Sequence, residues 1–168
     1  MHPSLDWIEN TAFSIWVRES GSIWSYPMLI TFHAWGMAML VGLSALIDLR
    51  LLGFGSGVPL TPLRKLVPLI RFGFVMSLLS GIALTIGDAG TMLIAPLFYI
   101  KIGLIALALA VGLRIERRVL LPELGADVMP AKGKALAWCS LILWLAAITG
   151  GRLTAYIGPA AALKGITH

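Results

Sequence analysis

The chain has 168 residues, of which 58% are hydrophobic and 12% are charged, and its mean hydropathy is +0.90. Soluble domains carry about 25% charged residues, so this composition excludes a soluble globular protein and indicates an integral membrane protein. The net charge of +5 lies in short segments between apolar runs, a distribution typical of membrane orientation rather than of nucleic-acid binding. The single cysteine, Cys139, excludes an intrachain disulfide and a two-cysteine metal or redox motif.

The first segment, residues 4–19, is too polar to cross a membrane but is amphipathic. Its apolar residues recur at helical spacing, and they are Leu5, Ile8, Ala12, Ile15 and Trp16. Its aromatic rings suit the headgroup layer, where a ring is half hydrated. We therefore expect one interfacial helix over residues 4–19, lying on one face of the membrane.

The first membrane span is expected at about residues 27–49. At about 1.5 Å per residue it is about 30 Å long, which matches the thickness of a bilayer core. From Pro27 to Ile47 it carries one ionisable residue, His33. A stripe of small residues, Ala34, Ala38 and Gly42, predicts close approach of another helix. Gly53 is expected to stop the helix.

Three further spans are expected at about residues 67–86, 96–113 and 135–157. Glycine and proline residues separate them, and the third helix is expected to continue past Arg114 into water. In the second span, Gly73, Ser77 and Gly81 repeat the small-residue spacing. The fold class is therefore all-α, an integral membrane four-helix bundle with an N-terminal interfacial helix, and residues 1–168 form a single membrane domain.

The basic residues predict the orientation of the four spans. Nine lie on the side of the first and third loops: Arg50, Arg64, Lys65, Arg71, Arg114, Arg117, Arg118, Lys132 and Lys134. Four lie on the other side: Arg18, Lys101, Arg152 and Lys164. Because basic residues stay on the cytoplasmic side, we expect both termini outside, which is the periplasm in a bacterium.

Ionisable groups from several spans converge on the outer half of the membrane. His33 lies about 9 Å below the outer surface, while Lys101 and Arg152 lie at the outer ends of the third and fourth spans. A charge at this depth needs a partner or water, so we expect one polar pocket. Imidazole is a common axial ligand of haem, and basic groups at the rim suit propionates. The sequence thus predicts a haem b or quinone site.

The remaining candidates for this cofactor site surround His33. Trp35 and Tyr156 are expected to line the pocket, and Met37 and Met76 are candidate thioether ligands. His33 is the candidate metal ligand, and because no other span contains a histidine, a second ligand would be a methionine or the His33 of a second copy. The structural alternative is that His33 only hydrogen-bonds Ser77 or Ser80 across the bundle, while Lys101 and Arg152 reach toward lipid headgroups.

At the inner end of the first span, two charged residues are interpreted as structural. Asp48 and Arg50 are two positions apart and so point to different faces of the helix. Asp48 is expected to pair with Arg71 or Arg114 of another helix, and Arg50 is expected to contact lipid phosphate. These pairs would fix the depth and rotation of the first span.

The chain resembles an uncharacterised family of small four-span bacterial inner-membrane proteins. The resemblance covers nearly the whole chain and lies in Pro27 with His33, the 48–53 tail Asp-Leu-Arg-Leu-Leu-Gly, Ser80-Gly81, Phe98 with Lys101, and Trp144 with Gly151-Arg152 and Tyr156. It implies a bacterial inner-membrane location and marks His33, Asp48, Arg50, Lys101 and Arg152. A looser similarity to b-type cytochrome and copper-resistance membrane proteins rests on an intramembrane histidine, although those families normally supply more than one.

Two classes of function follow from these residues. The first is a redox-linked membrane subunit that holds haem b or contacts a quinone near the periplasmic face. The alternative is a non-catalytic membrane anchor or assembly subunit, since no nucleophile and base pair is evident. Either would work as a homo-oligomer or with partner membrane subunits. A small transporter ranks lowest, because the helix breakers lie at the span ends and not in mid-membrane.

Overall fold

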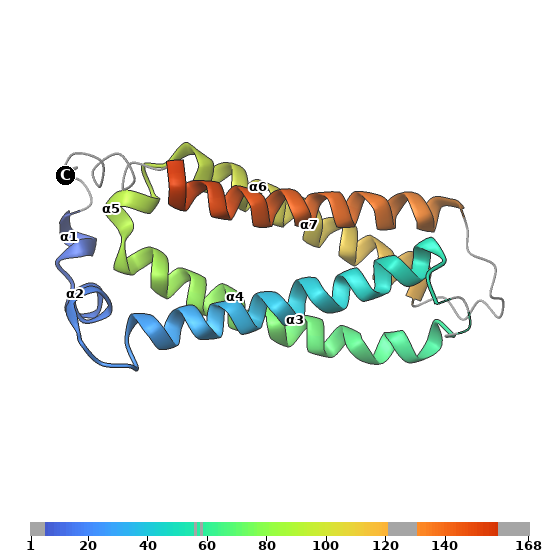
Figure 1. The fold of residues 1–168 in the computed structure, drawn as a ribbon, viewed down its shortest axis with the longest axis horizontal. Helices are drawn as coiled ribbons and strands as arrows, with labels where there is room; N and C mark the ends of the chain where they lie inside the picture. Colours follow the sequence, from blue (N-terminus) through green and yellow to red (C-terminus); the bar gives the residue numbers. More distant parts are fainter. Residues whose placement is uncertain (1–5, 56, 58, 121–130, 158–168) are drawn as a thin grey trace.

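The computed structural model describes residues 6–55, 57, 59–120 and 131–157, and every regular element among them is helical. Figure 1 shows four long helices side by side with short helices at one end. The elements are α1 (Asp6–Glu9), α2 (Ala12–Glu19), α3 (Tyr26–Leu52), a 3-10 turn (Thr61–Leu66), α4 (Val67–Gly87), α5 (Ala89–Met92), α6 (Pro96–Ile115), a π-type turn (Glu116–Leu120) and α7 (Ala131–Ile157). The predicted all-α four-helix bundle is confirmed.

The ends of the spans follow from the expected helix starters and stoppers. Pro27 lies in the first turn of α3, where its missing N–H is not needed. Gly53 ends the helix with φ of 109°, and the N–H groups of Gly53 and Phe54 bond the carbonyls of Arg50 and Leu49 at 3.2 and 3.1 Å. The helix therefore continues three residues past Leu49, the end expected from the sequence.

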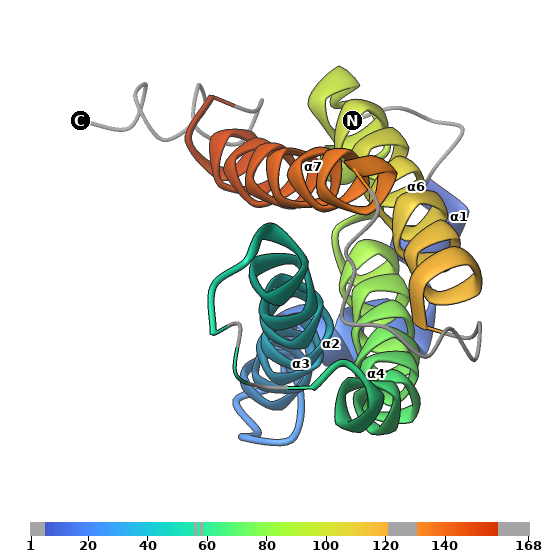
Figure 2. The same ribbon diagram turned by 90° about the vertical axis from the view of Figure 1, so that its right-hand side faces the viewer.

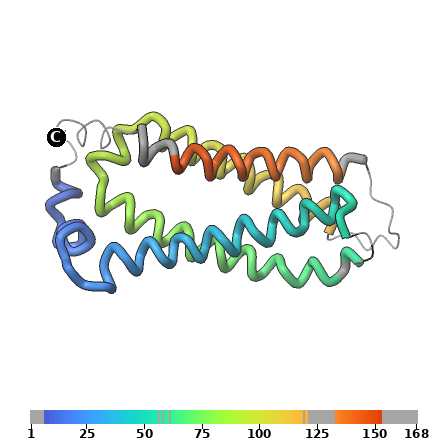
Figure 3. The backbone as a smooth tube through the Cα atoms, in the orientation of Figure 1, coloured from blue at the N-terminus to red at the C-terminus, as the bar shows by residue number. Residues whose placement is uncertain are grey.

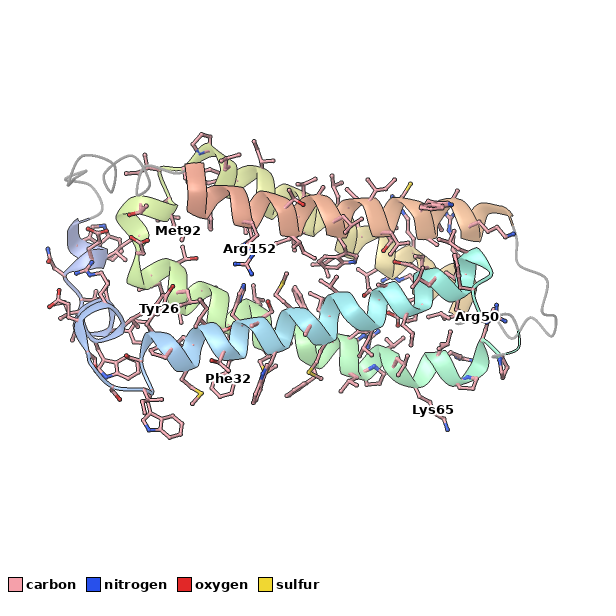
Figure 4. All side chains as sticks on the ribbon, viewed as in Figure 1. Tyr26, Phe32, Arg50, Lys65, Met92 and Arg152 are labelled. Atoms are coloured by element: carbon pink, nitrogen blue, oxygen red, sulfur yellow. The ribbon has the colours of Figure 1, made fainter. Side chains whose placement is uncertain are left out.

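The four long helices form two hairpins. Helix α3 packs along α4, and α6 packs along α7, while α3 also contacts α7. Figure 2 views the bundle end-on and shows the α3–α4 pair beside the α6–α7 pair. We call the end with α1, α2 and α5 the terminal end, and the end with Arg50 and Lys65, labelled in Figure 4, the loop end.

The hairpins are held together by two apolar clusters. One, at the loop end, consists of Ile47, Leu51, Leu63, Ile115, Leu120 and Ala137. The other, toward the middle, consists of Leu40, Ala108 and Trp144. Because both clusters join α3 to α6 and α7, α3 is the helix through which the first hairpin packs against the second.

Helices α3 and α4 meet at two glycines whose backbones are in contact. A Cβ atom on Gly36 would come within 2.6 Å of the Ser77 nitrogen and 2.8 Å of the Gly73 carbonyl oxygen. The stripe Gly73, Ser77 and Gly81 therefore packs against α3, as its spacing predicts. The other predicted stripe does not serve this contact, since Ala34, Ala38 and Gly42 are exposed and nothing lies near Gly42.

The N-terminal segment packs across the terminal end of the bundle (Figure 3). The expectation of one helix over residues 4–19 is wrong, because a turn at Asn10 and Thr11 divides the stretch into α1 and α2. The Ser14 hydroxyl donates to the Ile86 carbonyl at 3.2 Å, and the Glu9 carboxylate accepts from the Gly90 N–H at 2.7 Å. The location of this segment in the headgroup layer stays a prediction.

The outer faces of the bundle are apolar. Four helices are long and apolar enough to cross a membrane, at Tyr26–Leu52, Pro62–Gly87, Pro96–Arg118 and Gly133–Arg152. Exposed aromatic rings gather at the terminal end, among them Trp7, Trp24 and Tyr26, as expected for a membrane–water interface. The protein is therefore a multi-pass membrane protein whose helices contact the lipid bilayer.

The glycine contact gives a matched pair of substitutions on one helix. We expect Gly36→Ala to destabilise the protein by about 1–3 kcal/mol, because the added methyl group meets backbone atoms of α4 that have little room to move. Gly42→Ala should be neutral or slightly stabilising, since nothing lies within 4 Å of its Cβ position. Thermal unfolding in one detergent measures both, and equal losses of stability would contradict this packing.

Candidate functional site

His33 lies on α3 with one edge of its imidazole ring against α4. Its Nδ1 atom is 2.9 Å from the Ser77 carbonyl oxygen, and the hydroxyls of Ser77 and Ser80 are each 3.4 Å from the same atom. A carbonyl oxygen only accepts, so Nδ1 carries the proton and donates it. The other ring nitrogen, Nε2, is then unprotonated and has a lone pair for a ligand.

Gly81 makes room for this ring. A Cβ atom at Gly81 would lie 3.1 Å from Cε1 and 3.3 Å from Nδ1 of His33. The small-residue face of α4 thus serves two purposes, close helix packing at Gly73 and a seat for the imidazole at Gly81. The structural interpretation of His33 is correct for Nδ1, since Ser77 and Ser80 both contact it, and it leaves Nε2 unassigned.

Lys101 brings a positive charge close to His33 from α6. Its side chain passes Gly151 of α7, where a Cβ atom would be 3.4 Å from Cε and 3.6 Å from Nζ. The ammonium is near enough to His33 to act on it electrostatically. Within the described residues, neither ion pair involves Lys101. Lys101 therefore lies within electrostatic range of His33, and these are two of the three groups expected in the pocket.

Arg152 follows Gly151 directly and is exposed. In Figure 4 its side chain extends from α7 in the direction of α3, at the terminal half of the bundle. The residue before it, Gly151, lies against the Lys101 stem, and Arg152 supplies a second cation in the terminal half of the bundle. The side chain of Tyr156, the other residue expected here from α7, lies outside the described residues.

The other predicted lining residues separate into two groups. Met37 is one turn from His33 on the same side of α3 and is half-buried. Trp35 is 60% exposed and lines an apolar surface groove with Phe32, Ala38, Met39, Phe72 and Met76. Trp35 and Met76 therefore line a groove that His33 does not border, and the expectation that Trp35 lines the His33 pocket stays a prediction.

The charged residues expected to pair at the loop end have other partners. Arg71 bonds Glu116 at 2.6 Å, and Arg114 is exposed and makes no ion pair within the described residues. Asp48 has the Ser140 hydroxyl of α7 as its side-chain partner. The predicted pairing of Asp48 with Arg71 or Arg114 is therefore wrong. Arg50 is buried at 9% exposure and has an interaction of its own, so it is not directed to lipid phosphate.

Asp48 borders a cavity inside the bundle. This cavity has a volume of about 290 Å³ and lies between α3, α4, α6 and α7, toward the loop end. Its wall is mainly apolar, and its polar residues are Ser44, Asp48, Arg71, Glu116 and Ser140. Asp48 is 1% exposed, and among the described residues its Oδ2 atom has no hydrogen-bond partner. The bundle thus holds two polar locations, one at each end of α3.

Ser140 and Glu116 are the residues that sequence reasoning missed. Ser140 is one small polar residue in an apolar span, and nothing in its spacing distinguishes it from a packing residue. Glu116 is the only acid in the basic run 114–118, and that isolation was a usable sign that a basic residue of another helix pairs with it.

Metal binding by several side chains has no support in the described part of the chain, where no three His, Cys, Asp or Glu residues gather. His33 remains the single candidate ligand. No family model, no curated protein and no solved structure matches this chain. Its site is therefore interpreted from its own residues.

Two serines near the cavity give a prediction about Asp48. We expect Ser140→Ala to lower the free energy of unfolding by about 1–3 kcal/mol, because it leaves a buried carboxyl without its partner. Ser44→Ala lines the same cavity and should cost much less, since its hydroxyl bonds the Leu40 carbonyl of its own helix at 2.7 Å. Thermal unfolding compares the two, and an equal effect would exclude a special role for Ser140.

Proposed function

We propose that this protein is a redox-linked integral membrane subunit that holds haem b, or contacts a quinone, through His33. The observation that carries this proposal is the hydrogen bond from His33 Nδ1 to the Ser77 carbonyl. A histidine that ligates a metal usually donates its other ring N–H to a carbonyl or carboxylate, which fixes the tautomer and the ring orientation. His33 is therefore oriented so that its Nε2 atom would hold a haem iron.

The charges around His33 support an anionic or electron-rich ligand. Lys101 and Arg152 supply two cations on this side of the bundle, and neither has an ion pair in the described part of the chain. Haem propionates are carboxylates, which basic side chains bind through charge-assisted hydrogen bonds. For a quinone, Lys101 would donate to a carbonyl, and His33 Nε2 would accept from the hydroxyl of the reduced form. A bound haem would supply one-electron transfer.

His33, Lys101 and Arg152 suit a haem for which this chain would supply one ligand, His33. Met37 lies on the same side of α3 as His33, and Met76 faces the outer groove, so neither lies opposite the imidazole. A second copy's His33 does not suit either, because this ring is seated inside the bundle against Gly81. Any further ligand to a bound haem would then come from outside the chain.

Location and orientation belong to the same proposal. We infer a bacterial inner membrane and periplasmic termini, as expected from the resemblance to small four-span proteins and from the nine basic residues on one side against four on the other. With this orientation His33, Lys101 and Arg152 lie toward the periplasmic face, where a periplasmic electron carrier would have access to the site.

A role as an anchor or assembly subunit is the second candidate, and the exposed stripe of Ala34, Ala38 and Gly42 favours it. Because these three small residues are exposed and nothing lies near the Cβ position of Gly42, their surface is open to a helix of another subunit or of a second copy. The redox and anchor roles are compatible, since a redox subunit also needs a partner to receive its electrons.

The haem version predicts a visible spectrum. Protein purified from a haem-replete host should show a Soret band, and His33→Ala should reduce the haem per protein by about tenfold or more, because the only ligand from this chain is removed. Met37→Leu, one turn away, should keep the band. The measurement is absorbance normalised to protein, with far-UV circular dichroism as the control for folding.

A colourless wild-type protein would remove the haem version. If oxidation of a short-chain quinol in membranes were also unaffected by His33→Ala, the redox proposal would fail as a whole. Reproducible co-purification of one partner subunit would then leave the anchor role as the explanation of the fold.

The orientation predicts a labelling pattern. In a Cys139→Ser background, a membrane-impermeant maleimide should label Ser22→Cys in intact cells but label Lys65→Cys only after permeabilisation. Ser22 lies at the terminal end and Lys65 at the loop end. The reverse pattern would place the termini in the cytoplasm.

A further inference from the structure

The cavity at the loop end is a separate location from the His33 site and has no role in the proposed haem or quinone contact. Its decisive feature is Asp48, which is 1% exposed, borders the cavity and has an Oδ2 atom without a hydrogen-bond partner in the described part of the chain. An unpartnered buried oxygen is costly. A group that donates a hydrogen bond to Asp48 from within the cavity would remove that cost.

The volume and the wall indicate what kind of molecule supplies the donor. An apolar cavity of about 150 Å³ accommodates benzene, so about 290 Å³ accommodates an aromatic ring with substituents. Phe74 of α4 and Trp144 of α7 line the cavity together with aliphatic side chains. Water molecules would satisfy Asp48. They would not fill the rest of the cavity, because a buried water needs two to four polar partners and most of the wall is apolar.

The charges also favour a neutral ligand. Arg71 and Glu116, the oppositely charged groups of the wall, neutralise each other at 2.6 Å. Arg71 is exposed, so this pair lies where the cavity meets the surface. Asp48 and Ser140 lie deeper, and both are 1% exposed. A hydroxyl suits this arrangement, since it donates to the free Oδ2 atom of Asp48 while the Ser140 hydroxyl keeps its own bond to that carboxyl.

We propose that this cavity binds a neutral, lipid-soluble aromatic molecule with a hydroxyl group, of the phenol and hydroquinone class, whose hydroxyl donates to Asp48. The apolar ring lies among Leu40, Phe74 and Trp144. The ligand reaches the cavity from the lipid phase, where such molecules partition. This site is independent of His33.

Binding in the cavity is measured by the fluorescence of Trp144, which lines it. Full-length protein in nanodiscs is titrated with 4-bromophenol, whose bromine quenches a tryptophan that it touches, and the Trp144→Phe variant gives the signal of the other tryptophans. We expect saturable quenching that depends on Trp144. The matched compound 4-bromoanisole has the same ring but no hydroxyl donor and should bind about tenfold more weakly.

Substitutions test the contact itself. In Asp48→Leu the tenfold preference for the phenol over the anisole should disappear, whereas Ser44→Ala, which lines the same cavity, should keep it. His33→Ala should also keep it, so that failure of the haem proposal does not affect this result. If Asp48→Leu does not fold, as judged by circular dichroism, the two compounds on the wild-type protein decide.

Three results would overturn the inference. They are equal binding of 4-bromophenol and 4-bromoanisole to the wild type, a preference for the phenol that persists in folded Asp48→Leu, and an absence of Trp144-dependent quenching by either compound. Quenching of Trp144 by brominated lipid chains that 4-bromophenol does not displace would also overturn it, since it identifies the occupant as an acyl chain.

Discussion

The backbone contact between Gly36 and Gly73 determines how the first span lies on the second. It leaves no room for a side chain on either glycine, so it fixes both the separation and the register of α3 and α4. His33 is three residues before Gly36, and Ser77 is four residues after Gly73. Since the two helices run in opposite directions, the crossing brings the imidazole to the Ser77 carbonyl. The polar contact thus depends on an apolar one.

Helix α3 carries one polar side chain toward each end of the bundle, and the two have different surroundings. His33 is held by a neighbour in its own hairpin, α4. Asp48 instead bonds Ser140 of α7, in the other hairpin, and it borders a cavity lined by all four long helices. The hydrogen bond of His33 therefore needs only α3 and α4 to be correctly packed, whereas the approach of Lys101 to His33 and the cavity beside Asp48 exist only when both hairpins have come together.

The number and limits of the spans could be predicted from the sequence, because lipid imposes the length of an apolar run and because Pro27 and Gly53 act locally. The faces of the helices could not. A helix that is apolar on all sides has no amphipathic pattern to show which side is inside. The stripe Ala34, Ala38 and Gly42 has the right spacing for a helix contact, but Gly36, two residues away from two of its members, makes the contact with α4. The partner of Asp48 was missed for the same reason: choosing Ser140 over Arg71 requires the rotation of α7.

The N-terminal segment has a consequence for how the protein is made. Ser14 bonds carbonyls that lie 72 and 73 positions later in the chain, and Glu9 bonds an N–H that lies 81 positions later. These partners belong to the far end of the second span and the turn after it. During synthesis, α1 and α2 leave the ribosome before their docking surface exists, and they acquire it only after the second span has returned across the bilayer. Residues 6–19 are thus translated before the surface on which they dock, and their docking marks completion of the first hairpin.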